Sequence, residues 1–220
     1  MDDKDNQYQR IYDILNLHYG PQHWWPADTP FEVMVGAVLV QNTAWTNASA
    51  AIERLKQAEM MAPLAMSKTP IDELASLIVS SGYFNIKAKR LKSLCQWLVE
   101  QGDIAQLKQK SLKALRENLL RVHGIGPETA DDILLYALEK PVFVIDAYTR
   151  RLFSRLGLLQ HDASYEALRA GFEQALDNDV GLFNQYHALI VIHAKDICRK
   201  QPVCRDCCLR KECGEMQITT

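Results

Sequence analysis

The chain has 220 residues, of which 48% are hydrophobic and 24% charged, a composition typical of a soluble globular protein with one large domain or two small ones. Its formal net charge of −2 gives no sign of nucleic-acid binding, so any DNA-binding surface must be local. No apolar run approaches the roughly 18 residues of a membrane span. Residues 1–10 are acidic and polar rather than a secretory signal, so we expect a cytoplasmic monomer without a membrane partner.

Helical periodicity extends through nearly the whole chain, and no segment alternates long enough to predict a strand. The segment Thr29-Pro30-Phe31-Glu32 has the capping residues of a helix start, and an apolar run to Val40 follows. A second start of the same kind is expected at Thr69-Pro70-Ile71-Asp72. Further helices are predicted over Ile86–Glu100, Leu112–Val122, Pro127–Leu138, Tyr148–Leu156, Tyr165–Leu176 and Leu182–Lys195. The apolar run Val142–Ile145 has no partner strand and is interpreted as an extended lead-in.

Basic residues are concentrated in two segments despite the acidic net charge. Residues 87–92 include four of them, and residues 195–211 include six against two acidic residues. A solvated surface explains such clusters as well as a DNA-binding surface does, so charge alone does not decide between these interpretations.

A glycine-rich turn separates two of the predicted helices, in the sequence Gly124-Ile125-Gly126-Pro127. Two glycines permit a tight turn and a close approach of the backbone to another surface. The helix that opens at Pro127 begins with free N–H groups, which can hold a DNA phosphate without reading the base sequence. A plain connection between two helices is the alternative for this turn taken alone.

An aspartate, Asp146, lies 20 residues beyond Gly126. The turn and the aspartate together resemble the helix-hairpin-helix, Gly/Pro-rich loop and aspartate signature of the endonuclease III superfamily of DNA glycosylases, and the resemblance covers essentially the whole chain. It implies that Asp146 is catalytic and that Gly124, Gly126 and Thr129 contact DNA. Asp146 also stands where a helix N-cap is expected, and the two roles are compatible.

One position departs from the bifunctional members of this superfamily, which carry a lysine four residues after the first glycine of the hairpin. The residue here is Glu128, and a carboxylate cannot form the Schiff base that leads to strand cleavage. The sequence therefore predicts a monofunctional enzyme without AP lyase activity, with water as the nucleophile. Asp146 would stabilise the oxocarbenium-like sugar and orient or deprotonate that water, and Glu128 would border the base pocket.

Five of the six cysteines fall within 16 residues, whereas Cys95 stands alone in a predicted helix. The spacing Cys198-x5-Cys204-x2-Cys207-x5-Cys213 resembles the iron–sulfur loop of endonuclease III, whose first gap is usually one residue longer. Four thiolates suit a 4Fe-4S cluster or zinc. The resemblance implies a structural 4Fe-4S cluster that orders a basic loop facing DNA phosphate, with Cys208 as a spare.

Three tryptophans, Trp24, Trp25 and Trp45, lie close together in the sequence, the first two directly before Pro26. Core packing is the ordinary explanation for tryptophans in a helical protein. The set also resembles the 3-methyladenine glycosylases of the superfamily, in which a Trp-Trp-Pro stretch and an aromatic residue at the position of Trp45 sandwich the base. A 3-methylated purine is cationic and leaves readily, so stacking and shape can select it.

Gln41-Asn42-Thr43 corresponds to the stretch whose first glutamine enters the gap left by the flipped base. Adenine-mismatch members carry a glutamate four residues before that glutamine, and Ala37 here argues against excision of adenine opposite a damaged guanine. The loop at residues 82–87 resembles the wedge loop of the family, in which an apolar side chain props the duplex open. Ile86 and Lys87 are therefore candidate DNA contacts.

These observations predict an all-α protein with two helical domains, a helix-hairpin-helix motif and a C-terminal iron–sulfur cluster loop. Residues 22–132 would form a six-helix domain with the hairpin, and residues 1–21 and 133–220 would form the cluster domain. The expected activity is monofunctional removal of alkylated purines, such as 3-methyladenine, from double-stranded DNA. The alternatives are a glycosylase for oxidised or mismatched pyrimidines and a non-catalytic module that binds DNA damage.

Overall fold

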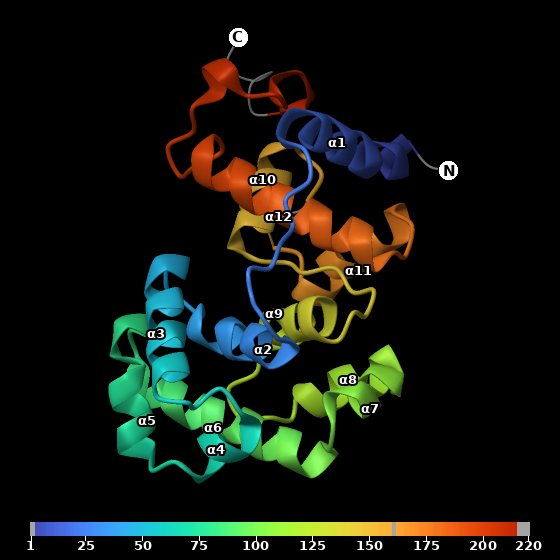
Figure 1. Ribbon diagram of the computed structural model, residues 1–220. Coiled ribbons are helices and arrows are strands. Elements are labelled where there is room, and N and C mark those ends of the chain that lie inside the picture. The colour runs from blue at the N-terminus through green and yellow to red at the C-terminus, as the bar shows by residue number, and fades with distance from the viewer. Residues whose placement is uncertain (1–2, 160–161, 215–220) are drawn as a thin grey trace. The chain divides into compact units, whose positions relative to one another are not determined.

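A computed structural model describes residues 3–159 and 162–214 of the chain (Figure 1). Every regular element in these two ranges is a helix, which confirms the predicted all-α class. The run Val142–Ile145 is buried, belongs to no helix and has no strand pairing in the described part of the chain. Among the same residues, no helix has the length and apolar character needed to cross a membrane.

The chain divides into two compact units. The first consists of Met1–Trp24 and Pro141–Thr220, and the second of Trp25–Lys140. The first unit contains α1 (Asp3–Tyr19), α10 (Ala147–Arg155), α11 (Tyr165–Ala175), α12 (Val180–Asp196), η3 (Cys204–Asp206) and η4 (Arg210–Glu212). The second contains α2 (Pro30–Leu39), α3 (Trp45–Gln57), α4 (Pro63–Lys68), α5 (Ile71–Leu77), η1 (Val79–Ser81), α6 (Phe84–Gln101), α7 (Ile104–Gln109), α8 (Leu112–Leu119), α9 (Pro127–Asp132) and η2 (Ile133–Ala137). The sequence analysis placed a six-helix domain at residues 22–132, and these domain boundaries remain a prediction.

Helix α2 forms the centre of the second unit. All of its residues from Phe31 to Leu39 are buried, as expected of a helix that is hydrophobic on every side. It packs against α3, α6, α9 and η2. The Thr29 hydroxyl caps it by accepting a hydrogen bond from the Glu32 backbone N–H at 3.1 Å, as the sequence predicts. Gln41 therefore follows shortly after the end of a fully buried helix.

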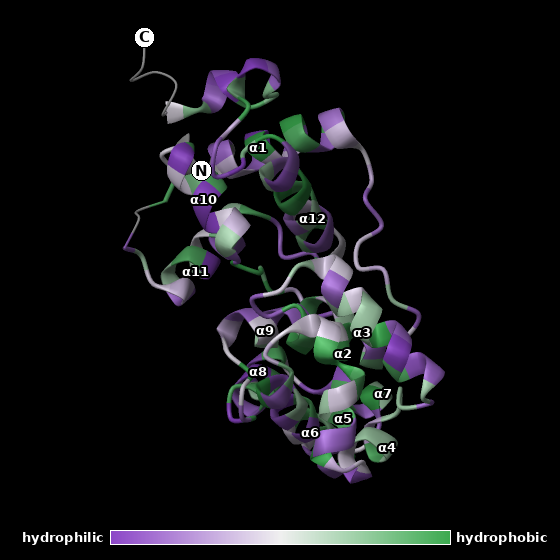
Figure 2. Cartoon of the chain, turned by 90° about the vertical axis from the view of Figure 1, so that its left-hand side faces the viewer, coloured by the Kyte–Doolittle hydropathy of each residue, from purple (hydrophilic) through white to green (hydrophobic). Residues whose placement is uncertain are grey.

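Aromatic packing holds the first unit together around α12. The Phe143 and Phe172 rings are stacked with centroids 4.0 Å apart, and Tyr186 lies edge-on to both. The Tyr186 hydroxyl donates to the backbone carbonyl of Tyr8 at 2.8 Å, which joins α12 to α1. Figure 2 shows hydrophobic and hydrophilic stretches alternating along the helices, as expected where one helix face packs inward.

Two predicted helix boundaries are wrong. Thr69 does not cap α5, because its hydroxyl donates back to the Ala65 carbonyl at the end of α4. The range Pro127–Leu138 is not one α-helix, because α9 gives way to the π-helical turn η2 after Asp132. A π-helix is set by how a turn packs rather than by hydrophobic periodicity, so the pattern could not reveal it.

A buried ion pair joins the two helices of the hairpin. The Arg116 Nε of α8 lies 2.7 Å from Asp131 Oδ1 of α9, and the Asp131 side chain is fully buried. We expect Asp131→Ala to lower the free energy of unfolding by about 3 kcal/mol, because it takes the carboxylate away from a desolvated guanidinium. Chemical denaturation measures this loss. Glu117→Ala, at a carboxylate elsewhere on α8, is the matched control, and an equal effect of both changes would contradict the prediction.

Candidate functional site

The hairpin turn depends on one of its two glycines for backbone geometry. Gly124 has a φ of +85°, in the left-handed region that favours glycine. A Cβ at Gly124 would also lie 2.1 Å from Cγ of Arg90, so a side chain there is excluded on two counts. Gly126 has a φ of −90° and caps α9, and a Cβ added to it would meet open space, so a side chain would fit there.

The glutamine predicted to fill the DNA gap is bonded to this turn. Gln41 Nε2 donates to the Gly124 carbonyl at 3.2 Å and to Thr129 Oγ1 at 2.8 Å, and Gln41 Oε1 accepts from Arg90 Nη1. Gln41, Gly124 and Thr129 were predicted as DNA contacts from separate motifs, and the fold brings them together. Arg90 was not among the predicted site residues.

Two apolar side chains at the start of α6 are exposed to solvent, Tyr83 at the N-cap and Ile86 in the first turn. Tyr83 is 69% exposed and Ile86 is 49% exposed, values unusual for such residues. Tyr83 has a left-handed backbone conformation with a φ of +47°, which is uncommon for a residue with a side chain. Ile86, a predicted DNA contact, is thus exposed, and Tyr83 just before α6 is the more exposed of the two.

Lys87, a predicted DNA contact, is buried, whereas a contact with DNA requires an exposed side chain. It is 1% exposed, and its Nζ donates to the carbonyls of Leu39 and Ser81 at 2.7 Å and to Thr43 Oγ1 at 2.8 Å. Burial, together with the charge of Arg90, lowers its pKa to about 8. Its ammonium group joins α2 to the loop before α6 and is enclosed by protein oxygens rather than presented to a phosphate.

Two of the predicted pocket residues meet in the second unit. The rings of Trp25 and Trp45 are nearly perpendicular, with centroids 5.4 Å apart. The ring centroid of Tyr136 lies 5.2 Å from that of Trp25. All three are partly exposed, in contrast to Trp97, which is packed in the core. Trp25 lies against Gly36 of α2, where an added Cβ would approach the indole nitrogen to 3.3 Å. These rings therefore form a partly open aromatic group rather than a closed core.

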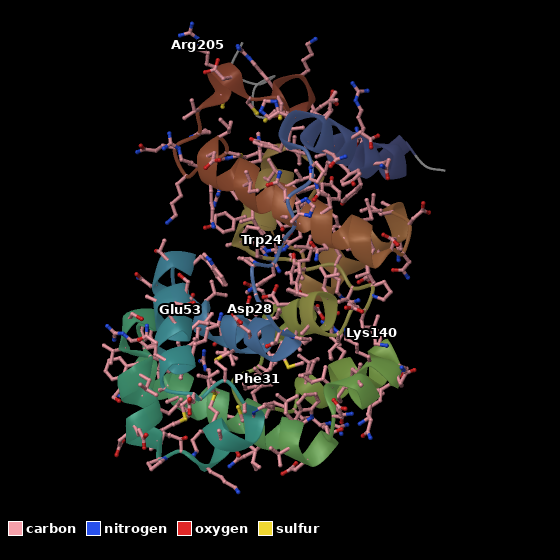
Figure 3. The ribbon with its side chains drawn as sticks, in the orientation of Figure 1. Trp24, Asp28, Phe31, Glu53, Lys140 and Arg205 are labelled. Carbon is pink, nitrogen blue, oxygen red and sulfur yellow. The ribbon has the colours of Figure 1, made fainter. Side chains whose placement is uncertain are left out.

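The loop that carries Trp25 and Pro26 is fixed by charges just beyond it. Lys56 Nζ of α3 lies 2.8 Å from both Asp28 Oδ2 and Glu32 Oε1. Hydrogen bonds to these two carboxylates raise the pKa of Lys56. Figure 3 labels Asp28 and Glu53, the latter a third carboxylate beside Lys56 at 3.8 Å. The loop of Trp25 and Pro26 is thereby tied to α3, the helix that begins with Trp45.

Trp24 belongs to the first unit, where a cation lies over its ring. The Lys195 ammonium is 5.9 Å from the Trp24 ring centroid and 5.8 Å from that of Tyr148 (Figure 3 labels Trp24). Glu128 is an exposed residue in the first turn of α9. The structure thus brings Trp25 and Trp45 into contact, whereas the pocket roles of Trp24 and Glu128 stay predictions.

Asp146 caps α10 and is held by two further groups of the first unit. Its Oδ1 accepts from the Thr149 N–H at 2.7 Å and from the Thr149 hydroxyl at 2.9 Å, and its Oδ2 lies 3.6 Å from His187 Nε2. Burial favours the neutral acid, but His187 and the Thr149 donors outweigh it, so the pKa of Asp146 is lowered. The carboxylate is therefore charged at neutral pH. His187 was missed because a lone histidine in a helix carries no motif.

The four predicted cluster cysteines line one cavity. Its other lining residues are mostly apolar and include Leu152, Leu156 and Ile197, and its open volume is about 440 Å³, solvent included. The Arg155 guanidinium donates to Cys198 Sγ at 3.3 Å. Cys208 does not line the cavity, although its sulfur lies 4.0 Å from Nδ1 of the buried His193.

The four cysteines can be compared with the ligands that metal groups require. No three His, Cys, Asp or Glu side chains in the described ranges converge as ligands of a single ion. Cys198, Cys204, Cys207 and Cys213 nevertheless line one cavity, so they supply the four thiolates that a 4Fe-4S cluster or a zinc ion requires.

Comparison with known proteins identifies the family. The model of the HhH-GPD superfamily of base excision DNA repair proteins matches residues 35–177. The chain belongs to this superfamily. It is a DNA glycosylase of base excision repair, which confirms the resemblance drawn from the hairpin and the aspartate.

Several relatives cover almost the same length. A protein of Methanocaldococcus jannaschii that carries the provisional name of a DNA repair glycosylase is 43% identical, over 96% of this chain and 98% of its own. Endonuclease III of Thermotoga maritima is 29% identical, over 84% of this chain and 82% of its own. Among solved structures, the 3-methyladenine DNA glycosylase of H. pylori bound to 1,N6-ethenoadenine is 30% identical with a TM-score of 0.75, covering 88% of this chain and 98% of that one. An endonuclease III–DNA complex with a TM-score of 0.84 is 21% identical, over 98% and 97% of the two chains, and shares the fold.

Proposed function

We propose that this glycosylase is monofunctional and releases alkylated purines, such as 3-methyladenine, from double-stranded DNA. The observation that carries the proposal is the partly open aromatic group of Trp25, Trp45 and Tyr136. Electron-rich ring faces attract a cationic methylated base, which they distinguish from a neutral one. The similarity to the 3-methyladenine DNA glycosylase of H. pylori supports this choice.

In the proposed mechanism Asp146 acts mainly through its charge. The C1′–N bond of the methylated nucleotide breaks with its electron pair going to the cationic base, which leaves neutral. The Asp146 carboxylate stabilises the oxocarbenium-like sugar, and water adds to C1′ and releases its proton to the surrounding water. A lowered pKa makes Asp146 a weak proton acceptor, so stabilisation and orientation of the water by its Oδ2 outweigh proton abstraction.

The proposal includes a two-domain arrangement and a structural cofactor. We place a 4Fe-4S cluster on Cys198, Cys204, Cys207 and Cys213, where it would order the basic loop that follows α12 and supply no step of the reaction. Arg205 projects from this loop (Figure 3) and is exposed, as a phosphate contact requires. Gln41, Gly124, Gly126, Thr129 and Ile86 are the remaining proposed DNA contacts, with Trp24, Pro26 and Glu128 bordering the base.

A second candidate activity is excision of oxidised or mismatched pyrimidines. The identity of 29% to an endonuclease III favours it. Base release from DNA treated with a simple methylating agent separates the two activities, since the freed base can be identified by chromatography. Release of an oxidised pyrimidine faster than 3-methyladenine would overturn the proposed specificity.

Trp45→Ala tests the aromatic group directly. A base stacked on an aromatic ring is typically worth about 1–3 kcal/mol, so release of 3-methyladenine at subsaturating DNA should slow by roughly ten- to a hundredfold. Trp45→Phe keeps a ring face and should cost much less. Unchanged release by Trp45→Ala, measured as kcat/KM, would remove Trp45 from the pocket.

The absence of lyase activity is tested by borohydride trapping. Wild-type protein should form no covalent complex with DNA, because the hairpin carries Glu128 rather than a lysine. Lys87 has a pKa of about 8, but its amine is buried and cannot reach a sugar. Glu128→Lys would place an amine in the first turn of α9, where the helix dipole lowers its pKa, and should give a trapped band. A strong band with wild-type protein would contradict the prediction.

A further inference from the structure

An arginine that no motif singled out lies beside the gap-filling glutamine. Arg90 of α6 donates from Nη1 to Gln41 Oε1, while both N–H groups of the Gln41 amide are bonded to the hairpin through Gly124 and Thr129. Only one acceptor position of the amide oxygen is left for another partner. The amide is thus held from three directions before any DNA arrives.

The backbone of the hairpin is built around the same arginine. Gly124 leaves room for the Arg90 side chain, whose Cγ would lie 2.1 Å from a Cβ at that position. The Arg90 Nε is buried and has no hydrogen-bond partner among the described residues, an arrangement that costs stability. The position of the guanidinium therefore satisfies the bond from Nη1 to Gln41 but leaves Nε without a hydrogen bond.

We propose that Arg90 is a positioning residue that fixes the Gln41 amide on the hairpin turn, so that the turn and the gap-filling side chain meet DNA as one rigid unit. A free glutamine side chain loses rotational freedom when it enters a gap, which reduces affinity by roughly tenfold. Holding Gln41 in advance avoids this loss. The inference rests on the proposed role of Gln41 in DNA.

The test measures the dissociation constant for a duplex that contains a tetrahydrofuran abasic analogue, by fluorescence anisotropy. Such a duplex has the gap but no damaged base, so the result does not depend on which base the enzyme releases. We expect Arg90→Leu to weaken binding about tenfold in the wild-type background and less than twofold in the Gln41→Ala background. The binding result would therefore still test the role of Arg90 if the enzyme did not release alkylated purines.

Salt dependence separates positioning from a direct phosphate contact. If Arg90 acts through Gln41, the slope of log K against log salt should be the same in Arg90→Leu as in the wild type. If Arg90 binds a phosphate, the slope falls by about 1 and the effect persists fully in Gln41→Ala, which would overturn the inference. Lys89→Leu removes the same charge from an exposed position one residue earlier and sets the scale for charge alone.

Thr129→Val keeps the proposal testable if Arg90→Leu does not fold. It removes one hydrogen-bond partner of the Gln41 amide without changing the net charge or the side-chain shape. It should weaken binding in the same direction and likewise have little effect in Gln41→Ala. Equal effects in both backgrounds would mean that Thr129 acts independently of the glutamine, and would overturn the inference.

Discussion

Asp146→Asn should slow base release by about a thousandfold or more while leaving DNA affinity nearly unchanged. In the proposed mechanism the carboxylate stabilises charge that develops only in the transition state, so its loss should lower kcat rather than binding. Asparagine is as good an N-cap as aspartate, so α10 should remain intact. Single-turnover excision and a separate binding measurement check both parts, and near-normal turnover would remove Asp146 from the mechanism.

The pH profile gives an independent test of the same residue. Because the pKa of Asp146 is lowered from 3.8, the carboxylate is ionised throughout the neutral range. A loss of activity from its protonation should therefore begin only as the pH falls below about 4, and its contribution to folding should be lost over the same acidic window. A titration of Asp146 between about pH 5 and pH 8 would contradict the charged resting state.

Cys204→Ser or Cys213→Ser should remove the cluster and strongly destabilise the first unit. Wild-type protein should contain iron and absorb near about 400 nm, and both variants should be colourless. Since ligation contributes directly to folding, the unfolding temperature should fall by roughly 10 °C or more. Metal analysis, visible absorption and thermal unfolding measure the three effects.

Cys208→Ser is the matched control for these changes. Cys208 adjoins Cys207 in the same loop but does not line the cavity of the four predicted ligands. Iron content and colour should therefore survive its replacement. Loss of iron in Cys208→Ser together with retention in Cys207→Ser would show that the spare cysteine is the ligand. One zinc ion in place of iron would contradict the cluster itself.

Local patterns carried most of what the sequence could predict. The hairpin glycines, the helix start at Asp146 and the cysteine spacing are each contained in one segment of at most 16 residues, so they can be recognised from local sequence. Arg90 and His187 acquire their roles from distant partners: Arg90 is 49 residues from Gln41 in the chain, and His187 of α12 lies beside Asp146. Contacts of this range depend on packing, which one sequence does not reveal.

The burial of Lys87 could have been predicted from the sequence. The buried face of α6 includes Ala88, Leu91, Leu94 and Leu98, and Lys87 lies one turn before Leu91 on that face. Lys89 lies on the exposed side. A count of basic residues in 87–92 does not distinguish the buried Lys87 from the exposed Lys89. Helical periodicity does distinguish them, because it places the two lysines on different sides of the helix.

The π-helical turn η2 follows α9 directly and forms the last part of one continuous helical segment. A π-helical turn is closed by i→i+5 rather than i→i+4 hydrogen bonds, so it accommodates about one more residue than an α-helical turn. Residues of α9 remain in register with the hairpin, while Tyr136, inside the wide turn, packs against Trp25. Because α9 ends at Asp132, before this turn, a substitution at Tyr136 that reshapes the aromatic group should leave Gly126 and Thr129, the proposed DNA contacts, in place. Substrate choice and DNA backbone contact would then be set by separate parts of one continuous helical segment.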